Sequence, residues 1–104
     1  PDNFIVIDIE TTGISTEFDD IIEIGAIKVR DNQVVEKFDQ LVYPGYKIDK
    51  FIEELTGITN EMLKGKPKIS AVISDFLDFL ESDSTILVGH NVNFDINFLI
   101  SFTP

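Results

Sequence analysis

The chain has 104 residues, of which 43% are hydrophobic, and its 8 basic and 19 acidic side chains give a formal net charge of −11. This length and composition fit one domain with a hydrophobic core and exclude an intrinsically disordered chain. The charge excludes a broadly basic surface of the kind that holds duplex nucleic acid non-specifically, although metal ions can still bring nucleic acid to an acidic protein.

Two features missing from the sequence narrow the choice of function. The chain has no cysteine, which excludes disulfides, thiol catalysis and cysteine–zinc sites and fits a cytoplasmic location. It has no apolar run near the ~18 residues that a membrane-spanning helix needs, so we expect no membrane partner.

The first half of the chain predicts three β-strands. Residues 4–9 form a β-branched run interrupted by an acid, which is typical of a central strand buried on both faces of an α/β sheet, and residues 11–13 end it. Residues 21–29 and 33–42 form two further strands. The turn residues at 31–32 between them predict a hairpin.

The next segment predicts helices. We expect a short helix over residues 50–56 that Gly57 ends as a left-handed cap, followed by a further helical turn that Thr59 caps. The clearest helix comes after Pro67. Its apolar residues recur at i, i+3, i+4, i+7, i+8 and i+11, and they are Ile69, Val72, Ile73, Phe76, Leu77 and Leu80.

A turn at residues 82–84, a short buried strand over residues 86–88 and a last helix complete the chain. We expect Asn93 to cap this helix, whose one side carries Phe94, Phe98, Leu99 and Phe102. The first and fourth strands are then parallel and joined by a helical crossover. Because no element follows the last helix, we expect its apolar face to lack a partner and the C-terminal part of the domain to be missing.

Asp8 and Glu10 interrupt the most hydrophobic strand. Side chains two apart on a strand point to the same face, ~6.6 Å apart along it, and two carboxylates beside an apolar core raise each other's pKa. A divalent cation such as Mg²⁺ or Mn²⁺ removes this repulsion and also holds phosphate oxygens. The alternative is a strand whose end has simply reached solvent.

Thr11, Thr12 and Gly13 follow this pair directly. Glycine lets the backbone turn sharply, so that the amides of Thr12 and Gly13 could meet a sugar hydroxyl or a phosphate. An ordinary strand-ending turn would have the same residues.

A second polar cluster, His90, Asn91 and Asp95, lies between the fourth strand and the last helix. Ligands of open α/β sheets bind at the carboxyl ends of strands, so Asp95 and the first pair of acids should converge on one crevice. Asp95 also suits the first turn of a helix for electrostatic reasons alone. We interpret His90 as a structural residue and not as a catalyst.

Four blocks of the sequence resemble, in order, the DnaQ-like (DEDD-type) 3′–5′ exonuclease family, and in particular bacterial proofreading exonuclease domains. They are residues 7–13 (Ile-Asp-Ile-Glu-Thr-Thr-Gly), 21–26 (Ile-Ile-Glu-Ile-Gly-Ala), 55–59 (Leu-Thr-Gly-Ile-Thr) and 90–95 (His-Asn-Val-Asn-Phe-Asp). The first and last blocks are similar to the family's first and second exonuclease motifs.

The resemblance implies an α/β fold, a ribonuclease H-like mixed sheet with helices, and catalysis by two divalent ions, Mg²⁺ or Mn²⁺. It assigns catalysis and metal binding to Asp8, Glu10 and Asp95. It also assigns contacts with the 3′ nucleotide to six residues, namely Thr11, Thr12, Gly13, Thr56, Asn91 and Phe94.

The family's third motif, which supplies a histidine general base and a fourth acid, has no counterpart in this sequence. We therefore expect residues 1–104 to be the N-terminal two-thirds of an exonuclease domain and to have little or no activity alone, because a missing general base usually costs ~10²–10⁴-fold. His90 matches the second motif, so it is not assigned as that base.

The resulting prediction is an enzyme of replication proofreading or repair that removes nucleoside 5′-monophosphates from the 3′ end of single-stranded or frayed DNA. A DNA polymerase or helicase subunit would present the strand. Three alternatives remain: an RNA 3′ exonuclease of the same family, a haloacid dehalogenase-like phosphatase, and a non-catalytic remnant that binds a metal or a partner.

Overall fold

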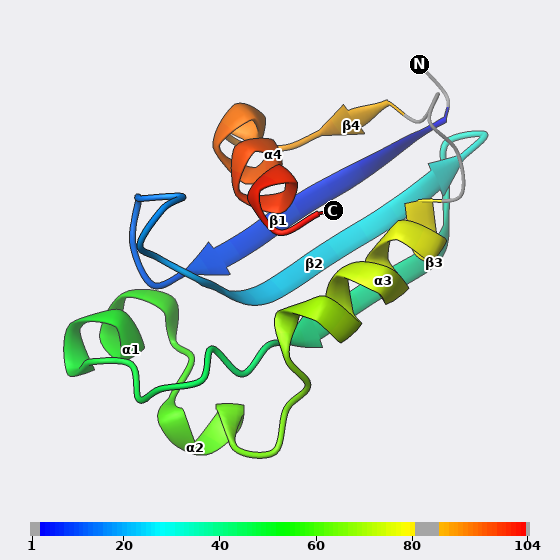
Figure 1. Ribbon diagram of the computed structural model, residues 1–104. Helices are drawn as coiled ribbons and strands as arrows, with labels where there is room; N and C mark the ends of the chain where they lie inside the picture. The colour runs from blue at the N-terminus through cyan, green and yellow to red at the C-terminus, as the bar shows by residue number, and fades with distance from the viewer. Residues whose placement is uncertain (1–2, 81–85, 104) are drawn as a thin grey trace.

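The computed structural model describes residues 3–80 and 86–103, and it shows one four-stranded sheet with helices (Figure 1). In chain order the elements are β1 (Phe4–Thr11), β2 (Ile21–Arg30), β3 (Gln33–Leu41), α1 (Lys50–Thr56), α2 (Asn60–Leu63), α3 (Ile69–Leu80), β4 (Leu87–Val88) and α4 (Val92–Ser101). The turn predicted at 82–84 lies outside the described residues.

The sheet is mixed, with the strand order β3-β2-β1-β4. The strands β1, β2 and β3 pair antiparallel, whereas β4 pairs with β1 in parallel. Asp31 and Asn32 join β2 to β3 with φ angles of 51° and 64°, the conformation that a tight two-residue hairpin requires. The predicted hairpin and the predicted parallel pair are both confirmed.

The helices α3 and α4 cover one face of the sheet. The buried side chains Ile5, Ile7 and Ile9 of β1 pack there against both helices. Phe98 of α4 is fully buried and Leu99 is nearly so, so the expectation that the last helix has an unpartnered apolar face is wrong for these two residues. They pack on the apolar side of β1, which α3 alone does not cover.

The buried stripe of α3 differs from the predicted one at a single step. Leu77 is 45% exposed, and Phe79 is buried in its place. The ring of Phe79 lies 5.6 Å from the ring of Phe38 on β3, and the Lys28 ammonium lies 4.5 Å from its centre. These contacts with the sheet favour the burial of Phe79, which the spacing of apolar residues within the helix did not predict.

The caps of the short helices follow the sequence signals. Gly57 ends α1 with φ 77°, and the Thr59 hydroxyl accepts a hydrogen bond from the Met62 amide, as predicted. The prediction for α4 is wrong, because its N-cap is Asn91 in the left-handed conformation, and Asn93 lies inside the helix. Two residues before this cap, Gly89 passes so close to β1 that an added Cβ would lie 2.6 Å from the Ile7 carbonyl oxygen.

A second, smaller core fixes α1 and α2 beside the sheet. It consists of Ile22 from β2 together with Ile48, Ile52, Ile58 and Leu63. Figure 1 shows that this places α1 on the same side of the molecule as the loop that follows β1. Among the described residues, no helix is long and apolar enough to cross a membrane.

Candidate active site

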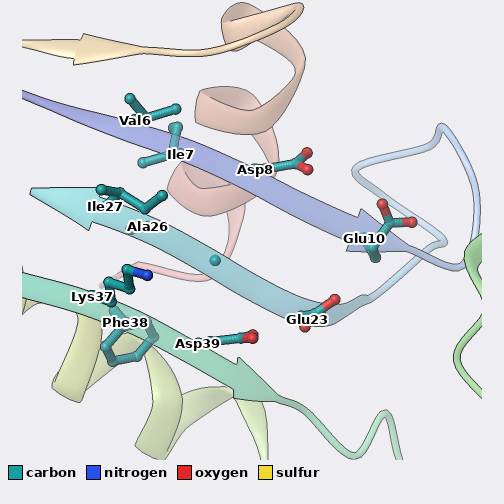
Figure 2. A pocket seen from close by; sticks show the side chains of 11 residues that line it. Val6, Ile7, Asp8, Glu10, Glu23, Ala26, Ile27, Lys37, Phe38 and Asp39 are labelled. Carbon is teal, nitrogen blue, oxygen red and sulfur yellow. The ribbon is translucent and has the colours of Figure 1, made fainter. Parts of the chain in front are cut away.

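Asp8 and Glu10 lie on the sheet face that α3 and α4 leave uncovered. They alternate along β1 with Ile7 and Ile9, whose side chains are buried under the helices. Both carboxylates therefore point away from the core, as Figure 2 shows. Asp8 is exposed and Glu10 is half-buried.

The strand register brings two further acids to this pair. Glu10 lies opposite Glu23 on β2, and Asp8 lies opposite Gly25, which in turn lies opposite Asp39 on β3. Because Gly25 has no side chain, the four carboxyl groups border a hollow of about 340 Å³. Figure 2 shows them at one end of it, with Val6, Ile27 and Lys37 at the other.

The charges of this cluster disfavour one another. Burial, followed by the charges of Asp8 and Asp95, raises the pKa of Glu10 above its ordinary 4.5. Burial, the hydrogen bond with Asp39 and the neighbouring charges raise the pKa of Glu23 to about 7. A cation at this end of the sheet would therefore stabilise the ionised carboxylates.

Asp95 reaches the site from the first turn of α4. It is only 4% exposed, and its Oδ2 accepts a hydrogen bond of 3.1 Å from the Ile9 amide. The short strand β4 pairs only with Ile5 and Val6, so this amide lies beyond the end of the ladder. Asp95 thus accepts the hydrogen bond of a backbone amide at the edge of β1 that has no strand partner, and it brings a third carboxylate beside the first two.

The pKa of Asp95 shows the same balance of forces. Burial raises it above its ordinary 3.8, the Ile9 hydrogen bond opposes that rise, and the charge of Asp8 adds to it. His90, which lowers the pKa of Asp95 through its charge, is exposed. Nearby, Asn91 is exposed and Phe94 is half-buried, with its ring 5.0 Å from that of Phe98.

The turn after β1 is held by its own hydrogen bonds. The Thr11 hydroxyl donates to the Gly13 carbonyl at 2.6 Å, and the Thr12 amide donates to the Asp20 carbonyl at 2.8 Å. A side chain at Gly13 would collide with the Asp19 carboxylate. Of the two amides considered above, that of Thr12 is therefore already hydrogen-bonded within the protein.

Thr56 has a structural role that the sequence did not indicate. Its hydroxyl donates to the Ile52 carbonyl at 2.8 Å and accepts from the Ile58 amide at 3.1 Å, so it fastens the end of α1. On the same helix Phe51 and Leu55 are exposed. The exposed side of α1 therefore presents apolar groups next to Thr56.

The donor set suits a hard divalent cation, since Asp8, Glu10 and Asp95 offer only carboxylate oxygens, and neighbouring charges raise the pKa values of Glu10 and Asp95. Within residues 3–80 and 86–103, however, no three His, Cys, Asp or Glu side chains gather closely enough to surround a single ion. Binding thus requires side-chain rotation, for which the exposed carboxylate of Asp8 has room.

Sequence reasoning assigned no role to Glu23 or Asp39. Glu23 interrupts an isoleucine-rich strand in the same way as Asp8 and Glu10 do. That signal marks Glu23 as unusual, but it is the pairing of β1 with β2 that places it opposite Glu10. Asp39 gave no such signal, because its strand is largely exposed.

Three comparisons bear on this arrangement. The sequence model of the family described as Exonuclease (RNase_T) matches residues 5–101. The PolC-type DNA polymerase III of Thermotoga petrophila is 48% identical over 96 residues, which are 92% of this chain and 7% of that protein. The DNA polymerase III subunit epsilon of Aquifex aeolicus is 46% identical over 100 residues, which are 96% of this chain and 48% of that protein.

Solved structures show the same fold. Apo exonuclease I superposes with a TM-score of 0.80 at 23% identity, over 93% of this chain and 23% of that one. Exonuclease X in complex with 5′ overhanging duplex DNA superposes with a TM-score of 0.73 at 30% identity, over 91% of this chain and 52% of that one. The chain thus spans about half or less of the length of each of these four proteins.

Proposed function

We infer that this chain removes nucleoside 5′-monophosphates from the 3′ end of single-stranded or frayed DNA. The chain belongs to the RNase_T family of exonucleases, and the inference rests on its site. The observation that carries the proposal is the hydrogen bond that fixes Asp95 to the Ile9 amide, between Asp8 and Glu10 near the carboxyl end of β1. Asp8 and Glu10 share the open face, and the Ile9 amide holds Asp95 beside them.

We propose that Asp8, Glu10 and Asp95 hold two divalent ions, Mg²⁺ or Mn²⁺. Such ions, when bound, activate water and neutralise the charge that develops on the scissile phosphate. Asp95 is buried and fixed by its hydrogen bond, whereas Asp8 is exposed. Burial and neighbouring charges raise the pKa values of Glu10 and Asp95, which is consistent with carboxylates arranged for a cation.

The turn after β1 is proposed to receive the terminal nucleotide. Thr11, Thr12 and Gly13 form a compact, hydrogen-bonded turn immediately beyond Glu10. We also propose nucleotide contacts for Thr56, at the end of α1, and for Asn91 and Phe94, at the start of α4 near Asp95.

A general base and a fourth acid are needed for full activity, and we propose that a third motif outside residues 1–104 supplies them. These residues would then be the N-terminal two-thirds of the domain. His90 is exposed beside Asp95, but it belongs to the second motif and is not proposed as the base.

A role in replication is supported by the names of the relatives, which are a PolC-type DNA polymerase III and an epsilon subunit. We propose that a polymerase or helicase subunit presents the 3′ end in the cytoplasm. The acidic surface is consistent with such help, because a net charge of −11 disfavours non-specific binding to the DNA backbone.

The test is digestion of a 5′-labelled single-stranded DNA with Mn²⁺, beside a matched RNA. We expect this chain to shorten the DNA slowly or not at all, and a longer chain that also carries the third motif to shorten it stepwise from the 3′ end. Asp95→Asn should remove the activity of the longer chain, and the exposed control Asp78→Asn should keep it. Activity that survives Asp95→Asn, or a preference for RNA, would contradict the proposal.

A further inference from the structure

The phenol of Tyr46 joins two segments that are far apart in the sequence. Tyr46 comes from the loop between β3 and α1, and its hydroxyl lies 2.6 Å from the Asp20 Oδ2 and 3.2 Å from the Thr12 hydroxyl. Both partners belong to the loop that follows β1. The side chain is 43% exposed, so its ring contributes little to the core.

The proton positions in this contact follow from the partners. The Asp20 carboxylate can only accept, so the Tyr46 hydroxyl donates to it. The Tyr46 oxygen is then an acceptor for the Thr12 hydroxyl, which has the Asp19 Oδ1 at 3.3 Å as its other acceptor. Burial and the hydrogen bond to Asp20 raise the pKa of the Tyr46 phenol, so it stays protonated at neutral pH.

The loop that carries Tyr46 is itself held firmly. The Ile48 amide donates to the Asn60 Oδ1 at 2.8 Å, and the Asn60 Nδ2 donates back to the Ile48 carbonyl at 2.9 Å. Ile48 also belongs to the second core with Ile52. Tyr46 therefore extends from a fixed part of the protein.

The two residues that Tyr46 contacts, Thr12 and Asp20, are also hydrogen-bonded to each other. The Thr12 amide donates to the Asp20 carbonyl at 2.8 Å, and the Asp20 amide donates to the Thr12 hydroxyl at 2.9 Å. A shift of Asp20 must therefore move Thr12. Because Thr12 is two residues from Glu10, the same shift would displace the turn at the edge of the acidic cluster.

We propose that Tyr46 is a positioning residue for the exonuclease site: through Asp20 and Thr12, its hydroxyl holds the Thr11–Gly13 turn in the conformation that receives the 3′ nucleotide. This inference rests on the proposed function. It adds a residue that neither the motif blocks nor the acidic cluster includes. The hydroxyl acts on nucleotide binding, whereas the metal carboxylates are positioned by β1 and α4 without it.

The experiment compares Tyr46→Phe with Tyr43→Phe. Tyr43 lies in the same loop with similar exposure, 37% against 43%, so the control removes the same atom from a similar place. Thymidine 5′-monophosphate is titrated by calorimetry in saturating Mn²⁺, and Mn²⁺ is titrated alone. We expect Tyr46→Phe to weaken the nucleotide about tenfold, to leave Mn²⁺ affinity within twofold and to change the melting temperature little. Tyr43→Phe should match the wild type throughout.

A double-mutant cycle with Asp20→Ala tests the route of the effect. If Tyr46 acts through Asp20, Asp20→Ala weakens the nucleotide in the wild type and adds little in the Tyr46→Phe background. Hydrogen exchange of the Thr12 amide supplies a readout without a ligand, and Tyr46→Phe should accelerate it several-fold.

The outcomes separate this inference from the proposed function. A wild-type chain that binds neither the nucleotide nor Mn²⁺ would overturn the proposed function. Wild-type binding with an unchanged Tyr46→Phe would overturn the role of Tyr46 alone. Equal losses of nucleotide, Mn²⁺ and melting temperature would show that Tyr46 is merely structural and would likewise overturn it.

Discussion

Replacing Glu23 by glutamine should change how the stability of the fold depends on pH. The pKa of Glu23 is about 7 in the folded protein against 4.5 ordinarily, so between these values the folded state binds more protons than the unfolded one. The folded protein therefore loses stability as the pH rises through this window. Below pH 4.5 the penalty is absent, and above about pH 7 it is complete.

The size of the effect follows from the same two values. The difference between 4.5 and about 7, at 1.36 kcal/mol per pH unit, sets an upper limit of about 3.4 kcal/mol. Glu23 is only half-buried, so solvent screening reduces this to about 1–2 kcal/mol. Glu23→Gln keeps the shape and can still donate to Asp39, so the variant should be more stable than the wild type by this amount at pH 8.

The assay is urea unfolding with EDTA at pH 5 and pH 8. The wild type should lose stability between the two, and Glu23→Gln should lose less. A residual slope is expected because the pKa values of Glu10 and Asp95 are also raised. Glu54→Gln, an exposed change on α1, should keep the wild-type slope. If Glu23→Gln is less stable than the wild type at pH 8, ionised Glu23 does not destabilise the fold, and the reasoning from its raised pKa is refuted.

Three more changes test the local structure, each by urea unfolding. Gly89→Ala should cost about 1–3 kcal/mol, because its Cβ would lie 2.6 Å from the Ile7 carbonyl oxygen; a neutral result would mean that β1 and the start of α4 are further apart. Gly57→Val should cost about 2 kcal/mol, since φ is 77° there, and an unchanged midpoint would refute the left-handed cap. Thr56→Ala should cost about 1 kcal/mol, because it removes two hydrogen bonds. An unchanged free energy of unfolding would contradict this structural role and leave the Thr56 hydroxyl with a role in substrate binding only.

Local signals were sufficient for most of the fold. The hairpin turn at 31–32, the Gly57 cap and the Thr59 cap depend on backbone conformations that nearby residues determine, and the sequence predicted all three. The errors arose where distant residues decide. Phe79 replaces Leu77 in the core because Phe38 of β3 contacts it.

The candidate site divides in the same way. Alternation along β1 was enough to place Asp8 and Glu10 on one face. The hydrogen bond that fixes Asp95 joins residues 86 positions apart, so only the strand topology suggested that they would meet. The contact of Tyr46 with Thr12 and Asp20 had no signal at all, because an exposed tyrosine in a loop has no periodicity that points to a partner.

Binding of Mn²⁺ tests the central assignment most directly. Calorimetric titration at pH 7.5 should give metal binding for the wild type that Asp8→Ala and Glu10→Ala largely abolish, because both carboxylates lie on the open face at the end of β1. Asp78→Ala removes an equal charge from the exposed side of α3 and should leave the affinity unchanged. Similar losses in all three variants would mean diffuse binding to an acidic surface and would contradict the site.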